Sequence, residues 1–110
     1  MGYDVHITRA SEWSDSESSP IALEEWVAVV TSDAEMRLTG TAEAKTADGV
    51  LRYENPGLAI WTKAPHSGAW FDYRRGRIVV KNPDTEILAK MKQIAGKLRA
   101  KVIGDEGEEY

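Results

Sequence analysis

The chain has 110 residues, a formal net charge of −4 at pH 7 and no cysteine. This length supports one domain with a genuine core, so we expect residues 1–110 to form a single domain. The acidic balance argues against a dedicated nucleic-acid-binding protein, which is usually strongly basic. The lack of cysteine excludes disulfides, thiol nucleophiles and thiolate metal sites.

The start of the chain and its hydropathy favour a cytoplasmic protein. Met1 to Ile7 contains no apolar leader region. No stretch approaches the roughly 20 apolar residues that a membrane-spanning helix needs. We therefore expect a cytoplasmic location and no membrane association.

The first third of the chain predicts a strand, a loop and a helix. Residues 3–8 alternate apolar and polar side chains, as a half-buried strand does. Residues 10–20 are rich in Ser, Glu and Asp and predict a loop or a short irregular turn held by Trp13. A helix is expected to follow Pro20 and to end near Asp33. Its apolar stripe consists of Leu23, Trp26, Val27 and Val30.

The middle of the chain predicts short strands joined by tight turns. The expected strands are 38–45, 50–54, 58–63, 69–74 and 77–81. Asp48-Gly49 and Arg75-Gly76 are turn signals, because glycine and aspartate tolerate positive φ angles. Strands joined in this way pair in opposite directions, so the sheet should be mostly antiparallel.

The last third predicts a second helix and a final strand. Asn82 is expected to cap the helix and Pro83 to occupy its first position. Lysines beside the apolar arc, including Lys90, are interpreted as solvated edges of a packed helix. We expect a short strand at 101–103, followed by an acidic tail. The apolar arc of the helix consists of Ile87, Leu88, Met91, Ile94, Ala95 and Leu98.

Together these elements predict an α+β fold. Each helix has a single apolar stripe, so both should lie on one face of a mostly antiparallel sheet of five to seven strands. The result is a two-layer sandwich. A ferredoxin-like core, β-α-β-β-α-β, with an inserted hairpin fits this order of elements.

The sheet face away from the helices is the first place to look for a binding site. Strand alternation places His6 opposite the core side of its strand, and it places Trp70, Asp72 and Arg74 on one side of another strand. If Trp61 shares that side, the five residues line one concave surface. Trp and Arg are frequent anchors of protein interfaces. The alternative is that the aromatic side chains belong to the core or form cross-strand pairs.

The remaining polar groups match no motif for catalysis, a metal or a cofactor. His6, with Asp4 nearby, could serve as a general base. No nucleophile is identifiable, however, and a histidine whose hydrogen bonds are satisfied within the protein is the simpler interpretation. His66, in a Pro-Gly loop, is expected to be exposed. The acidic clusters at 12–17 and 105–109 lack the spacing of a calcium loop. They are interpreted as solvated charge or as a surface for a basic partner. We expect neither a metal nor a cofactor.

Six stretches of the sequence carry a resemblance to a known group of proteins. They are Tyr-Asp-Val-His-Ile-Thr-Arg at 3–9, Leu-Glu-Glu-Trp at 23–26, Pro-Gly-Leu-Ala-Ile-Trp-Thr at 56–62, Trp-Phe-Asp-Tyr at 70–73, Ile-Val-Val-Lys-Asn-Pro-Asp at 78–84 and Gly-Asp-Glu-Gly-Glu at 104–108. With them the chain resembles a family of small uncharacterised bacterial proteins that has no assigned activity. The resemblance implies a bacterial origin, and it transfers no functional residue.

Two functions from different classes fit these observations. The leading hypothesis is a non-catalytic protein-binding or accessory protein of the bacterial cytoplasm, of the kind that includes toxin-neutralising immunity proteins. It rests on the acidic surface, the aromatic-rich sheet and the missing catalytic constellation. The alternative is a small enzyme or ligand-binding module that uses the open sheet face, with His6, Asp72 and Arg74 as polar groups and Trp61 and Trp70 as walls. A homodimer formed through the sheet face or an edge strand would also explain exposed aromatic residues.

Overall fold

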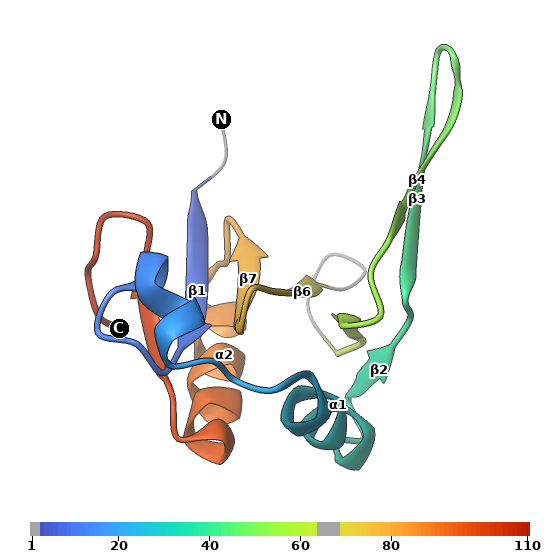
Figure 1. The fold of residues 1–110 in the computed structure, drawn as a ribbon. Helices are drawn as coiled ribbons and strands as arrows, with labels where there is room; N and C mark the ends of the chain where they lie inside the picture. The colour runs from blue at the N-terminus through green and yellow to red at the C-terminus, as the bar shows by residue number, and fades with distance from the viewer. Residues whose placement is uncertain (1–2, 64–68) are drawn as a thin grey trace.

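Figure 1 shows a computed structural model of the chain, which describes residues 3–63 and 69–110, except for the side chains of residues 41–46 and 51–53. In these residues, six strands form one antiparallel sheet in the order β2-β5-β6-β7-β1-β8, and β3 and β4 form a separate two-stranded sheet. The elements in chain order are β1 (Asp4–Thr8), the short 3₁₀ helix η1 (Trp13–Ser18), α1 (Leu23–Ser32), β2 (Met36–Leu38), β3 (Thr41–Thr46), β4 (Gly49–Glu54), β5 (Leu58–Trp61), β6 (Ala69–Arg74), β7 (Arg77–Lys81), α2 (Thr85–Leu98) and β8 (Lys101–Gly104).

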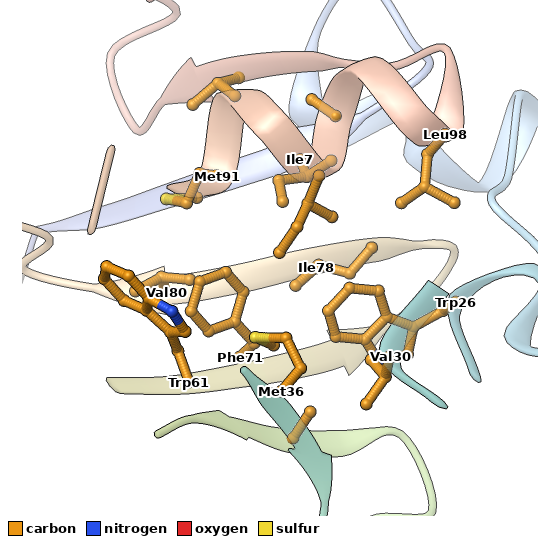
Figure 2. Close-up of a cluster of buried hydrophobic side chains, with 14 of the residues drawn as sticks. Ile7, Trp26, Val30, Met36, Trp61, Phe71, Ile78, Val80, Met91 and Leu98 are labelled. Carbon is orange, nitrogen blue, oxygen red and sulfur yellow. The ribbon is translucent and has the colours of Figure 1, made fainter. Parts of the chain in front are cut away.

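Both helices pack on the same face of the six-stranded sheet. Trp26 of α1, Met91 of α2, and Phe71 and Ile78 of the sheet are fully buried in one hydrophobic cluster, seen between the layers in Figure 2. Burial of each such side chain stabilises the fold by about 1.5–3 kcal/mol. The predicted α+β sandwich, with an antiparallel sheet and two helices on one face, is confirmed.

The core follows the split βαβ arrangement that the sequence suggested. Strands β8, β1, β7 and β6 lie side by side, and each neighbouring pair is antiparallel. With α1 after β1 and α2 after β7, this is the β-α-β-β-α-β order of a ferredoxin-like core. The insertion between α1 and β6 is larger than the single hairpin predicted. Strands β5 and β2 extend the sheet beyond β6, and the β3–β4 hairpin projects away from it (Figure 1).

The hairpin leaves the sheet because the predicted strand 38–45 is broken in two. Thr39 and Gly40 both donate their backbone N–H groups to the carbonyl oxygen of Leu58, at 2.9 and 3.2 Å. Gly40 has a φ of 72°, in the left-handed region that favours glycine. This local bulge interrupts the regular ladder and redirects the chain into β3.

The first turn of α1 is held by a side chain other than the cap residue. Ala22 has no side-chain acceptor, so the Glu25 carboxylate accepts the Ala22 backbone N–H at 3.2 Å. At the next position in the helix, the Trp26 indole N–H donates to the Gly57 carbonyl oxygen at 2.8 Å. Gly57 in turn lies so close to Tyr73 that no side chain fits there. The helix is thereby fixed against the turn that leads into β5.

The start of α2 corrects the sequence prediction. The helix begins at Thr85, and Asp84 is its cap, with a carboxylate oxygen 2.9 Å from the Ile87 backbone nitrogen that donates to it. Asn82 has a φ of 47° and its side-chain oxygen accepts the Tyr3 backbone N–H at 2.8 Å. Asn82 therefore ties the end of β7 to the start of β1, and Pro83 lies before the helix.

Candidate functional site

The strand register decides which predicted site residues share a face. Trp70 pairs with Ile60, and Asp72 pairs with Val79, which pairs with His6. Directly paired side chains lie on the same side of a sheet. His6, Trp70, Asp72 and Arg74 therefore lie on the face away from the helices, which we name the outer face.

Trp61 lies on the opposite face from the other four predicted residues. It pairs with Ala69 and Met36, both of which belong to the core beneath the helices. Its indole N–H donates to Glu35 at 3.3 Å, and its ring lies 5.8 Å from the Lys90 ammonium. The expectation that the five residues line one surface is therefore wrong at Trp61, because the sides of β5 and β6 could not be matched without the pairing register.

One half of the outer face, over β7, β1 and β8, is covered by the segment that contains η1. The Trp13 ring stacks on the His6 ring with centroids 4.4 Å apart and an angle of 5° between the planes. The Trp13 indole N–H donates to the Asp105 carbonyl oxygen at 3.1 Å. Val79 and Ile103, which point to this face, are buried. We call this region the covered half, and Trp13 holds its turn as the sequence predicted.

His6 is fully engaged beneath this cover. Its Nε2 lies 2.8 Å from an Asp105 carboxylate oxygen, and its Nδ1 accepts the Arg77 Nε–H at 3.2 Å. Because Nδ1 accepts a hydrogen bond, the ring is neutral and Nε2 is its donor. Burial lowers the pKa of His6, the Arg77 charge lowers it further, and the hydrogen bond to Asp105 opposes both. With 2% exposure and both nitrogens occupied, His6 is a satisfied histidine and cannot reach a substrate from this position.

The partner of His6 differs from the one the sequence suggested. Asp4 contributes its backbone N–H, which donates to the Asp105 carboxylate at 2.9 Å. Within the described part of the chain, the Asp4 side chain forms no hydrogen bond with His6. Asp105 is the true partner of His6. It lies 99 positions away in the chain, and no local pattern links the two residues.

Arg77 and Ser16 complete the sealed polar group. The Arg77 guanidinium donates to the Ser16 hydroxyl at 3.2 Å and lies 5.2 Å from the centre of the Trp13 ring. The buried Ser16 hydroxyl donates to the Arg75 carbonyl oxygen at 2.9 Å. Burial lowers the pKa of Arg77, and its positive neighbours Arg75 and Arg74 lower it further. These contacts join η1 to the β6–β7 turn.

The other half of the outer face, over β6, β5 and β2, presents an aromatic side chain to solvent. Trp70 is 44% exposed, beside the half-buried Ile60 with which it pairs. Arg37 pairs with Ile60 from the other side and is exposed. We call this region the open half. The row Arg37, Ile60 and Trp70 crosses three neighbouring strands and forms its centre.

Asp72 and Arg74 lie on the open half and are engaged with neighbours. The Arg74 Nε–H donates to one Asp72 carboxylate oxygen and the Asn55 amide donates to the other, each at 2.6 Å. Arg74 is 48% exposed, whereas the Asp72 side chain is 14% exposed. Asp72 thus positions the turn before β5 on one side and an exposed arginine on the other.

A second ionic group, on the helix side of the sheet, was missed at the level of sequence. Lys90 of α2 is 5% exposed, although a solvated edge was predicted. Its ammonium lies 2.7 Å from an Asp33 carboxylate oxygen and 3.3 Å from a Glu35 oxygen. The prediction failed because the two acidic residues follow α1, more than 50 positions earlier, and helical periodicity carries no information about them.

Other expectations concern groups outside these surfaces. His66 lies outside the described residues. Within residues 3–63 and 69–110, no three His, Asp or Glu side chains are arranged to hold a metal ion. Neither described helix has the length and apolar content needed to cross a membrane.

Comparison of the chain with protein-family models, with curated proteins and with solved structures found no match. The resemblance of the six sequence stretches to a bacterial family stays a prediction.

Proposed function

We propose that this is a non-catalytic protein-binding protein that docks its partner on the open half of the outer face. The observation that carries the proposal is the 44% exposure of Trp70 on a face whose other half is sealed. Trp side chains are enriched among the anchors of protein interfaces, and truncating such an anchor costs about 2 kcal/mol of binding energy or more.

The charges around Trp70 indicate what kind of partner fits. Arg37 and Arg74 are both exposed and lie on the same face as Trp70. A protein surface with an apolar socket for the indole and with Asp or Glu at its rim complements this arrangement. Rim charges of this kind raise the association rate and make it sensitive to salt.

The sealed state of His6 supports a binding role over a catalytic one. Among the described residues of the outer face, His6 is the group best suited to acid–base chemistry, and it is buried with both nitrogens occupied. A pocket walled by both Trp61 and Trp70 is not available, since the two lie on opposite faces. More specifically, we propose that it is an accessory protein of the bacterial cytoplasm. An immunity-like protein, which neutralises a toxin by binding it, is one example of this role.

The test is capture of the partner from a lysate of the source cells by wild-type protein, followed by measurement of its affinity with purified components. We expect Trp70→Ala to weaken binding by about 30-fold or more. Arg37→Glu should slow association and reverse its salt dependence. The control is Val50→Ala, which removes an exposed apolar side chain at the tip of the hairpin and should leave the affinity unchanged.

Two results would overturn this function. One is a captured partner whose affinity is unchanged by Trp70→Ala and Arg37→Glu. The other is light scattering that shows a homodimer dissociated by Trp70→Ala, because the open half would then bind a second copy of this chain.

A further inference from the structure

A hollow of about 300 Å³ lies on the helix side of the sheet, on the opposite face from the open half. Residues Glu86, Ala89, Lys90 and Gln93 line it from one side of α2, since they recur every three or four positions. Trp61 of β5 and Glu35, which precedes β2, complete the lining. The volume is at the lower end of the range found for small-ligand sites.

The charges in and beside the hollow do not balance. The Lys90 ammonium is held by Asp33 and Glu35, and its side chain is 4% exposed. Glu86 is exposed and has no ion-pair partner in the part of the chain that the structure describes. Glu35, Glu86 and the Lys90 ammonium give the lining a net charge of −1, and Asp33 beside it adds a carboxylate whose charge Lys97 partly offsets. This balance attracts a cation and repels an anion.

Hydrogen bonds hold the pKa values of Glu35 and Asp33 below their ordinary values. Donation from the Trp61 indole, and then from Lys90, holds the pKa of Glu35 below its ordinary value. Burial raises the pKa of Asp33, but the hydrogen bonds from Lys90 and from the Glu35 backbone, with the charges of Lys90 and Lys97, together outweigh it and the net shift is downward. The Glu35 side chain is 47% exposed and uses one carboxylate oxygen, Oε1, for both Trp61 and Lys90. Among the described residues, no donor forms a hydrogen bond with its Oε2, which faces the ligand in the site described below.

The walls of the hollow suit an aliphatic stem that carries the cation. The Trp61 ring supplies a flat apolar surface that also attracts positive charge, as its 5.8 Å contact with the Lys90 ammonium illustrates. Ala89, with a single methyl group, leaves room between Glu86 and Gln93 on the surface of α2.

We propose that this hollow binds an alkylammonium group, either free as a diamine or at the end of a lysine side chain. The ammonium lies between Glu35 and Glu86, and its methylene stem lies along Trp61 and Ala89. This site is separate from the open half and does not depend on the function proposed there.

The test is a titration followed by ¹H–¹⁵N NMR, with the Trp61 indole N–H signal as reporter, assigned from its loss in Trp61→Phe. The probes are 1,5-diaminopentane and Nα-acetyl-lysine methylamide, and the controls are 1,5-pentanediol and sodium chloride at equal ionic strength. We expect saturable shifts with a Kd of about 1–10 mM for at least one amine. A response to the lysine derivative alone would identify a peptide side chain as the source, and a response to the diamine would identify a free amine.

Two variants and one matched control sharpen the result. Ala89→Leu, which fills the hollow, should abolish the saturable shift, and Glu86→Gln should weaken it at least threefold. Glu24→Gln removes the same charge from the first turn of the other helix and should leave binding unchanged. Circular dichroism confirms that each variant is folded.

The proposal fails if neither amine gives saturable shifts, or if pentanediol or sodium chloride produces the same shifts. It also fails if Ala89→Leu binds as wild type does, or if Glu24→Gln weakens binding as much as Glu86→Gln. Trp70→Ala should leave these titrations unchanged, so the outcome is independent of partner docking on the open half.

Discussion

The two halves of the outer face contain similar residue types but differ in their exposure to solvent. Each combines an aromatic ring with an aspartate and an arginine: Trp13 with Asp105 and Arg77 in the covered half, and Trp70 with Asp72 and Arg74 in the open half. In the first, the tryptophan comes from another segment and closes over His6. In the second, it comes from the strand itself and faces solvent.

This contrast separates a structural polar cluster from a candidate interface. A buried polar group must have its hydrogen bonds satisfied within the protein, so the covered half uses its donors and acceptors on itself. The open half exposes the Trp70 ring and Arg37 to solvent, and Arg74 is about half exposed while paired with Asp72. An exposed aromatic side chain therefore indicates recognition better than a histidine–aspartate pair does in this protein.

Substitution of Trp13 and of Trp70 is the strongest test of the difference between the two halves. Trp13→Ala removes the cover of His6 and the donor to Asp105, and we expect it to lower the free energy of unfolding by about 2–4 kcal/mol. Trp70→Ala should change it by less than about 1 kcal/mol, because the side chain is exposed. Urea unfolding monitored by circular dichroism measures both. Equal losses would mean that the open half is also part of the structural core.

Two arginines on neighbouring strands test the same difference between the covered and the open half, with smaller expected changes in stability. Arg77 and Arg74 lie directly opposite each other in the ladder. Arg77→Ala leaves His6 Nδ1 without its donor, and we expect a cost of about 1–3 kcal/mol. Arg74→Ala removes a half-exposed ion pair and should cost about 0.5 kcal/mol or less. If Arg74→Ala proves the more destabilising, the assignment of the two halves is reversed.

The pH dependence of stability sharpens the description of the covered half. The groups that face His6 are Asp105, Arg77 and Asp4. Burial, and then the Arg77 charge, lower the pKa of His6 below the ordinary 6.5, although the Asp105 hydrogen bond and the charges of Asp105 and Asp4 act in the opposite direction. The unfolded chain therefore binds more protons than the folded one as pH falls through 6.5, so stability is complete above that pH and declines below it. Asp105 stays ionised in this range, because its pKa is also lowered.

Urea unfolding at several pH values between 7.5 and 5 measures this decline. His6→Gln, which can still donate to Asp105, should flatten the profile, whereas His66→Gln should retain it. A rise in stability on acidification would show that Asp105 stabilises a charged His6 and would contradict the neutral ring assigned here.

The sequence and the structure agree where the information is local. The alternation along residues 69–74, the Arg75-Gly76 turn and the apolar arc from Ile87 to Leu98 are each determined by residues that are neighbours in the sequence. These patterns were enough to predict the class of fold. They also placed Trp70, Asp72 and Arg74 correctly on one side of their strand.

Prediction failed where two distant segments meet. The side of Trp61 depends on the register between β5 and β6, and the burial of Lys90 depends on acidic residues that follow α1. The partner of His6 comes from the last turn of the chain. The periodicity of a single helix or strand contains no information about these contacts. The members of the two polar clusters therefore could not be predicted from the sequence.

The amino-acid sequence alone determines the set of strands and the two amphipathic helices, because side-chain periodicity and turn residues act between residues a few positions apart. Which surface is sealed and which is open was decided by tertiary structure. The cause is that the η1 segment and the acidic tail close over one half of the sheet through contacts spanning most of the chain, while Trp70 receives no such cover from the described residues.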